Sequence, residues 1–156
     1  MRAEYVNPFI IGALEVFDEV AQIELKKSEV TLKESTAPEN QIAILIDVTG
    51  FLVGQVVYSF KEHTAQRIVQ SMMPNSPPEK QAEYLLDALS SMANMITGHA
   101  TILLAGKEHV IRISPPVVRI GIKNPAEFLQ RKTISVIFTS RFGTMEVNIS
   151  LRENKD

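Results

Sequence analysis

Residues 133–151 read TISVIFTSRFGTMEVNISL, and this stretch decides the fold class. Apolar and polar residues alternate on both sides of a break at 141–143, which is typical of two strands joined in a hairpin. Two more β-rich runs, IAILIDV at 42–48 and FLVGQVVYSF at 51–60, meet at residues 49–50 in the same way. Strands that come in hairpins predict an antiparallel sheet.

Three helices are predicted around these hairpins. Apolar residues recur at helical spacing over residues 8–25, over 61–73 and over 79–104, which gives the longest helix. Asn7, followed by Pro8, is predicted to cap the first helix with its side-chain amide. Three prolines in the stretch PNSPPEK break the chain between the second helix and the third.

Shorter elements complete the chain. Strands are predicted in EVTLKES at 29–35, HVIRIS at 109–114 and VVRIGI at 117–122, and a short helical turn over 124–130 begins with its own asparagine cap. A helix followed by a hairpin therefore occurs twice. This order predicts an α+β fold, an antiparallel or mixed sheet packed by long helices, in a single domain over residues 1–156.

Composition restricts the classes of function. The 156 residues are 45% hydrophobic and 22% charged, as in ordinary globular domains, and the formal charge of -2 gives no reason to expect nucleic acid as a partner. No stretch reaches ~18 uncharged apolar residues, so no membrane span is predicted. The acidic residues that interrupt the first apolar run argue against a secretory signal, and we expect a cytoplasmic protein.

Few residues are suited to an active site of the chain's own. The sequence contains no cysteine, and His63, His99 and His109 do not stand at a metal-ligand spacing. It has neither a Gly-rich phosphate loop nor a nucleophile elbow. A self-contained active site is therefore not predicted, and neither is a metal site.

One face of the longest predicted helix carries a row of small and polar residues. In DALSSMANMITGHA, residues 87–100, steps of four, three and four place Asp87, Ser91, Asn94 and Gly98 on that face. The row is either an ordinary solvated face or a surface shaped to receive a partner, and the spacing alone leaves both interpretations open.

Two stretches resemble the CheC/CheX/FliY family of bacterial chemotaxis phosphatases, and CheX most closely within it. Residues 47–73, DVTGFLVGQVVYSFKEHTAQRIVQSMM, are similar to the family's paired-glycine hairpin and following helix, and DALSSMANMITGHA is similar to its signature helix. That signature runs from an acidic or serine residue through a glutamate, an asparagine and a glycine to a proline. The matching residues are Asp87, Asn94, Gly98 and either Pro115 or Pro116. The place of the glutamate is occupied by Ser91.

The resemblance implies a function. Members of the family remove phosphate from the aspartyl phosphate of the response regulator CheY; their asparagine orients the attacking water, and the regulator binds the Mg²⁺. Asn94 is therefore expected to be catalytic, because an amide both donates and accepts hydrogen bonds and can position a water. Asp87, Ser90, Ser91 and Gly98 are expected to dock the partner, and no cofactor is expected in this chain.

Ser91 leaves an alternative to the phosphatase. A hydroxyl lacks the charge and the reach of a glutamate that pairs with a lysine of the regulator. The chain is then either an active phosphatase or a catalytically silent module that binds a regulator on the same fold.

Two further expectations concern the ends of the chain. The resemblance implies a homodimer, and the alternating run at 144–151 is predicted to be the sheet edge at which two copies pair. Glu4 and Asn7 repeat the Glu–x–x–Asn spacing of the family motif. A capping Asn7 would leave Glu4 outside the helix, so no second site is predicted there.

Overall fold

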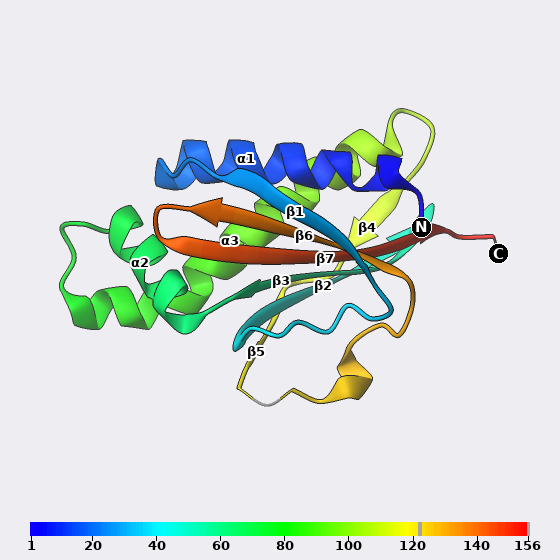
Figure 1. Cartoon of the computed structure of the whole chain (residues 1–156). Helices are drawn as coiled ribbons and strands as arrows, with labels where there is room; N and C mark the ends of the chain where they lie inside the picture. Colours follow the sequence, from blue (N-terminus) through cyan, green and yellow to red (C-terminus); the bar gives the residue numbers. More distant parts are fainter. Residues whose placement is uncertain (122, 156) are drawn as a thin grey trace.

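Seven strands form one antiparallel sheet in the part of the chain that the computed structural model describes, residues 1–121 and 123–155. Figure 1 shows the α-helices on one side of this sheet, which confirms the predicted α+β class. The strand order is β1-β6-β7-β3-β2-β4, and β5 also pairs with β2. In chain order the elements are η1 (Ala3–Tyr5), α1 (Asn7–Ala21), β1 (Lys26–Lys33), β2 (Ile42–Gly50), β3 (Leu52–Phe60), α2 (Glu62–Met72), α3 (Pro78–Ala105), β4 (Ile111–Ile113), β5 (Val117–Ile120), η2 (Pro125–Glu127), β6 (Thr133–Ser140) and β7 (Gly143–Glu153).

Both predicted hairpins are confirmed, since β2 pairs with β3 and β6 pairs with β7. The hairpins join where β3 pairs with β7, from Leu52 opposite Glu153 to Phe60 opposite Met145. The prediction that residues 144–151 form a sheet edge is wrong, because β7 lies between β6 and β3. Alternation shows which face of a strand is buried but not which strands lie beside it, and the observed edge on this side is β1.

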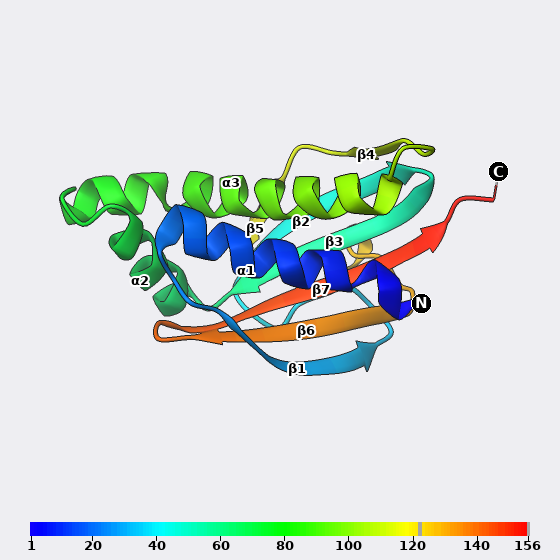
Figure 2. The same cartoon turned by 90° about the horizontal axis from the view of Figure 1, so that it is seen from above.

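Side chains on the helix-covered face of the sheet are apolar. Val56 of β3, Val136 of β6 and Ile149 of β7 are fully buried there. Helices α1 and α3 lie over this face and run antiparallel to each other (Figure 1, Figure 2). Removal of apolar surface from water stabilises the layer by about 25 cal/mol per Å².

Helices α1 and α3 approach each other closely at Gly12. A Cβ added there would lie 3.3 Å from the carbonyl oxygen of Ile96 and 3.8 Å from the Cβ of His99, so glycine permits the short distance between the helices. Helix α1 ends at Ala21, earlier than predicted, because Gln22 adopts a left-handed conformation with φ of 52°.

The start of α1 differs from the prediction. Asn7 is the first residue of the helix, Val6 occupies the cap position, and no side chain caps this end. A 3-10 turn over Ala3–Tyr5 precedes the helix, and its last N–H bond runs from Val6 to the Ala3 carbonyl at 3.0 Å. The interpretation of Asn7 as a cap is therefore wrong, because the backbone is already helical before it.

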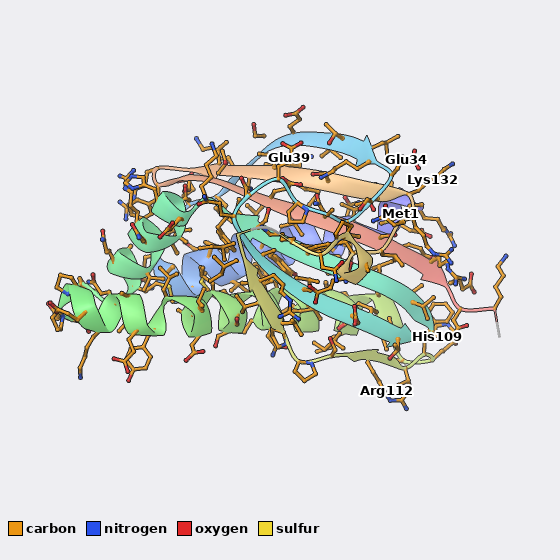
Figure 3. All side chains as sticks on the ribbon, turned by 90° about the horizontal axis from the view of Figure 1, so that it is seen from below. Met1, Glu34, Glu39, His109, Arg112 and Lys132 are labelled. Atoms are coloured by element: carbon orange, nitrogen blue, oxygen red, sulfur yellow. The ribbon has the colours of Figure 1, made fainter. Side chains whose placement is uncertain are left out.

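Loops close the opposite face of the sheet through polar contacts and through a small apolar cluster, in which Phe128 packs with Ala43, Leu45 and Val57. Figure 3 shows one loop crossing this face near Glu39 and another near Lys132. Gln55 of β3 joins them, because its Oε1 accepts a hydrogen bond from the Thr36 hydroxyl at 2.5 Å and one from the Leu129 N–H at 3.0 Å. Directional hydrogen bonds therefore hold the loops on this face together with a small apolar cluster, whereas the packing beneath the helices is mainly apolar.

The short elements agree with the sequence where they are described. Asn124 caps η2, since its Oδ1 accepts a hydrogen bond from the Ala126 N–H at 3.0 Å. The strand predicted over 117–122 is observed as β5, which ends at Ile120, and residue 122 lies outside the described residues.

Candidate functional site: the outer face of helix α3

The predicted row of small and polar residues lies on the outer face of α3, away from the sheet. Asp87, Ser91 and Asn94 are exposed, whereas Ser90 and Gly98 are half-buried at the margin of the face. The opposite side of the helix is buried in the core. The structure therefore places all five predicted site residues along one side of one helix.

A buried hydrogen bond fixes α3 to the sheet beneath this face. The Tyr58 hydroxyl of β3 lies 2.7 Å from Thr97 Oγ1, and the Thr97 hydroxyl donates to the Ala93 carbonyl at 2.8 Å, so Tyr58 is the donor to Thr97. Burial raises the pKa of the Tyr58 phenol, against the opposite effect of its bond with Thr97, so the hydroxyl stays protonated. Because Thr97 lies one turn after Asn94, this bond fixes the rotation of the helix that turns Asn94 outward.

The connection between β4 and β5 runs beside α3. Ser114 ties it to β2, because its N–H donates to the Asp47 carbonyl at 2.9 Å and its hydroxyl accepts from the Asp47 N–H at 2.8 Å. Pro115 and Pro116 follow and have no N–H to offer, which ends the pairing of β4. Helix α3 contacts both β4 and β5, so Pro115 and Pro116, either of which matches the motif's proline, lie between two strands that pack against the motif helix.

The side chain of Asn94 is free to hold a ligand. No hydrogen bond to any of the described residues engages its amide. Ser91 lies one turn earlier, and Asp87 lies about 10 Å from Asn94 along the helix axis. The face thus offers an amide that can orient a water, and its carboxylate is too distant to contact the same water.

The Glu4–x–x–Asn7 spacing lies at the start of α1, with Glu4 outside that helix as expected. Glu4 lies in the 3-10 turn and Asn7 in the first turn of α1, and both are exposed. The carboxylate of Glu4 is already paired with Arg2, whose guanidinium also lies over the Tyr5 ring, 5.5 Å from its centroid. We assign no site here, because the local arginine competes for the only acidic group of the pair.

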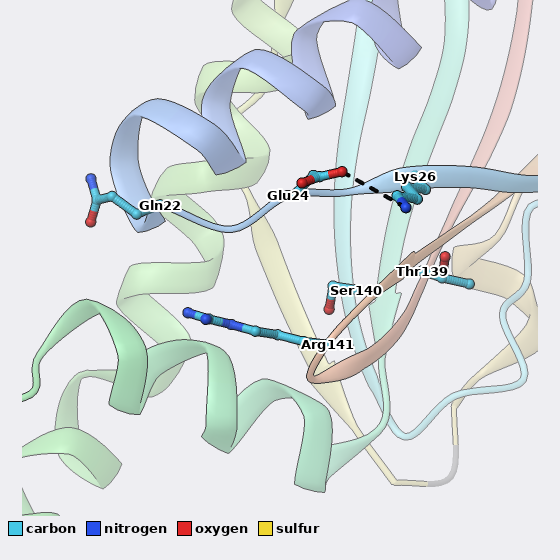
Figure 4. A pocket seen from close by; sticks show the side chains of 6 residues that line it. All are labelled: Gln22, Glu24, Lys26, Thr139, Ser140 and Arg141. Atoms are coloured by element: carbon cyan, nitrogen blue, oxygen red, sulfur yellow. Dashed lines mark ion pairs between the residues drawn. The ribbon is translucent and has the colours of Figure 1, made fainter.

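A polar pocket lies elsewhere, beside the end of α1. It has a volume of about 460 Å³, and Figure 4 shows Gln22, Lys26 and Arg141 among its lining residues. Glu24 also lines it and pairs with Lys26 at 3.9 Å. No residue of α3 lines this pocket, so it is separate from the candidate site.

Residues 1–121 and 123–155 contain neither a metal-binding group nor a membrane-spanning helix. No group of three or more His, Cys, Asp or Glu side chains there is arranged to hold a metal ion. None of the helices in those ranges has the length and apolar character needed to cross a membrane.

Comparison with known proteins identifies the family. The family model described as chemotaxis phosphatase CheX matches residues 42–139, a range that includes the whole of α3. The chain belongs to the CheX family. The resemblance predicted from the motif helix is thereby confirmed.

Individual members of the CheX family agree with this result. The CheY-P phosphatase CheX of Thermotoga maritima is 28% identical over 121 residues, which are 78% of each chain. The chemotaxis protein CheX of Vibrio vulnificus has a TM-score of 0.80 at 27% identity and covers 96% of this chain and 100% of its own. The fold is also that of a chain in the CheX–CheY–BeF₃–Mg²⁺ complex from Borrelia burgdorferi. The TM-score is 0.77 at 20% identity, over 97% of this chain and 100% of that one.

Sequence reasoning missed the residues that position the site of this CheX family chain. Tyr58 and Thr97 are fully buried and join the sheet to α3, yet neither belongs to the motif. The sequence did contain a signal for this pair, because Thr97 is a polar residue on the buried side of a helix and Tyr58 is a polar residue on the buried side of a strand. Two such residues are expected to pair, since a buried polar group without a partner is costly.

Proposed function

We propose that this chain dephosphorylates the aspartyl phosphate of a CheY-type response regulator and that Asn94 orients the attacking water. The observation that carries the proposal is the exposed and unengaged amide of Asn94 on the outer face of α3, in a chain of the CheX family. The Thermotoga relative is named a CheY-P phosphatase, and the Borrelia relative was solved with CheY. These names support the same partner for this chain.

The proposed reaction is an in-line displacement at phosphorus. The water oxygen bonds to phosphorus while the bond from phosphorus to the aspartyl oxygen breaks, which leaves a free carboxylate and inorganic phosphate carrying the water protons. Asn94 accepts a hydrogen bond from the water through its Oδ1, which aims an oxygen lone pair at phosphorus without adding charge. In this proposal the regulator binds the Mg²⁺, and the present chain contributes no cofactor.

Ser91 favours a second candidate function, a silent module that binds the regulator. The residue is exposed one turn before Asn94, where the family motif has a glutamate. A serine hydroxyl cannot form the charge-assisted bond of a carboxylate with a lysine. Such a module binds the phosphorylated receiver domain without accelerating the loss of its phosphate.

Phosphate loss from a receiver domain separates the two functions. A receiver domain from the same genome, charged with acetyl phosphate, is followed alone, with the wild type and with Ser91→Glu. If the chain is a phosphatase, the wild type accelerates the loss. Ser91→Glu then lowers the half-saturating concentration roughly ten- to a hundredfold, since a hydrogen bond to a charged group contributes about 1.5–3 kcal/mol.

Ser91→Gln is the matched control, because it supplies similar reach without charge. Acceleration by Ser91→Glu alone identifies the wild type as the binding module. If neither the wild type nor Ser91→Glu changes the rate, the phosphatase proposal is wrong.

Assembly is proposed from β1, one of the two edges of the sheet. We propose a cytoplasmic homodimer of a single CheX-like domain over residues 1–156, with β1 in place of β7 as the pairing strand. β1 pairs only with β6 in the described chain, and it exposes Val30 and, at 83%, Leu32. An unpaired edge with exposed apolar side chains is suited to pairing with a second copy. Light scattering at micromolar concentration should give twice the chain mass, and a monomer would exclude the dimer.

A further inference from the structure

A second pocket lies directly beside the candidate site. It has a volume of about 310 Å³ and lies between α2, the first half of α3 and β5. Six of the residues that line it are Ile42, Glu62, Gln66, Leu85, Leu86 and Ile120. It is separate from the polar pocket at the end of α1, with which it shares no lining residue.

The lining of this pocket is mainly apolar although it is open to solvent. Ile42 is buried in its wall, Leu85 and Leu86 are half-buried, and Ile120 is 58% exposed. Ile120 lies on β5, opposite Ile42 of β2. A branched side chain that remains this exposed gains free energy when another apolar group covers it. The pocket therefore suits an apolar side chain of leucine or methionine size.

The pocket has charges of both signs around it. On the β5 side the Lys123 ammonium donates to the carbonyls of Gln41 and Gly121, at 2.9 and 2.8 Å, and on the helix side there are carboxylates. Glu62 lines the pocket itself, and Glu83 and Asp87 are exposed four residues apart on the outer side of α3. No ion pair joins any of these three carboxylates to a base within residues 1–121 and 123–155. An incoming surface is complementary when it brings an apolar side chain to the pocket and a lysine or arginine to these carboxylates on the helix side.

The pocket is continuous with the outer face of α3. Leu86 lines the pocket, its neighbour Asp87 belongs to the face, and Ser90 lies one turn further toward Asn94. A partner that covers Asn94 on the side of β5 therefore extends over the mouth of the pocket. The partner that the proposed function places at Asn94 is a receiver domain.

We propose that this α3–β5 pocket receives an apolar side chain, flanked by a basic one, from the receiver domain that docks over Asn94. The inference rests on the proposed function and adds to it a determinant of partner choice. The pocket contributes to affinity, whereas Asn94 contributes to the chemical step. Receiver domains without the apolar and basic pair are bound more weakly and are discriminated against.

The test measures binding and turnover separately. The full-length chain is titrated into a receiver domain held in its activated form with beryllium fluoride and Mg²⁺, and the same variants are assayed for phosphate release. Ile120→Ser is expected to weaken binding about tenfold and to leave the maximal rate unchanged, because an exposed strand residue is truncated without disturbing the core. Ile11→Ser removes a comparably exposed apolar side chain from α1, which contributes no residue to the pocket, and is expected to change neither value.

The outcomes separate this inference from the proposed function. Unchanged binding of Ile120→Ser, together with a slow Asn94→Ala, overturns the pocket and leaves the phosphatase standing. Weaker binding of Ile120→Ser, together with an unaffected Asn94→Ala, supports the pocket and overturns the role of Asn94. Absence of any binding by the wild type overturns both. A change in the mass of the free chain on Ile120→Ser, seen by light scattering, assigns the pocket to a second copy and also overturns the inference.

Discussion

Helices α1 and α3 lie side by side on the same face of the sheet, and each has an exposed asparagine, but the two asparagines have different surroundings. Asn7 of α1 follows a glutamate that is already paired with Arg2, whereas Asn94 of α3 has no partner among the described residues. The glycines of the two helices differ as well. A Cβ at Gly12 would contact α3, while a Cβ at Gly98 would have nothing within 4 Å. Whether a short motif can act as a site therefore depends on which of its side chains the fold leaves exposed and unpaired.

The strongest test of this comparison replaces the two asparagines in parallel. Asn94→Ala is expected to slow phosphate release from the charged receiver domain roughly a hundredfold, because a water that must be positioned loses its acceptor. Asn7→Ala, its matched control on α1, is expected to leave the rate unchanged. Equal losses in the two variants would show that both helices act, and the contrast between them would fail.

A smaller effect is expected from the bond that fixes α3 to the sheet. Tyr58→Phe should lower the free energy of unfolding by about 1 kcal/mol, since one buried hydrogen bond is lost while the Thr97 hydroxyl keeps its bond to the Ala93 carbonyl. Urea denaturation measures the change. Tyr84→Phe on the exposed side of α3 is the control and should be neutral. A neutral Tyr58→Phe would mean that packing alone sets the rotation of α3.

The smallest effect concerns the glycines of the two helices. Gly98→Ala should raise the free energy of unfolding by about 0.5–1 kcal/mol, because alanine favours the helix and the added methyl meets nothing. Gly12→Ala should gain less, because its methyl would press on the Ile96 carbonyl oxygen at 3.3 Å. Thermal unfolding of the two variants provides the measurement. A larger gain at Gly12 than at Gly98 would reverse the assignment of which helix face is open.

Local patterns predicted the elements because their causes are local. The two hairpins follow from alternation interrupted at short breaks, and the cap at Asn124 follows from one side chain and the next backbone N–H. The helix that carries Asn94 follows from apolar spacing over residues 79–104. The motif face was predicted for the same reason, since residues on one helix face are fixed by their spacing alone.

Most of what the sequence did not predict depends on contacts between elements that are far apart in the chain. β7 is central because β3 pairs with it, and the side-chain pattern of an edge strand would be similar. Asn7 is a local exception. It is not a cap because a 3-10 turn at Ala3–Tyr5 comes before it, and capping preferences do not predict such a turn. The bond between Tyr58 and Thr97 joins a strand to a helix, and the sequence does not show that these two elements are in contact. The pocket at Ile120 likewise forms between elements that are distant in the chain.

The central pairing of β3 with β7 has a consequence for synthesis and folding. The β2–β3 hairpin is complete early in the chain, but its partner strand begins only at Gly143. At ribosomal elongation rates, roughly ten seconds pass between the emergence of these two strands. During this time β3 exposes an unpaired apolar edge, and the contacts that finally cover it have a large sequence separation, which slows their formation. Newly made chains should therefore avoid aggregation only at low concentration or when bound to a chaperone, until their last strand has been synthesised.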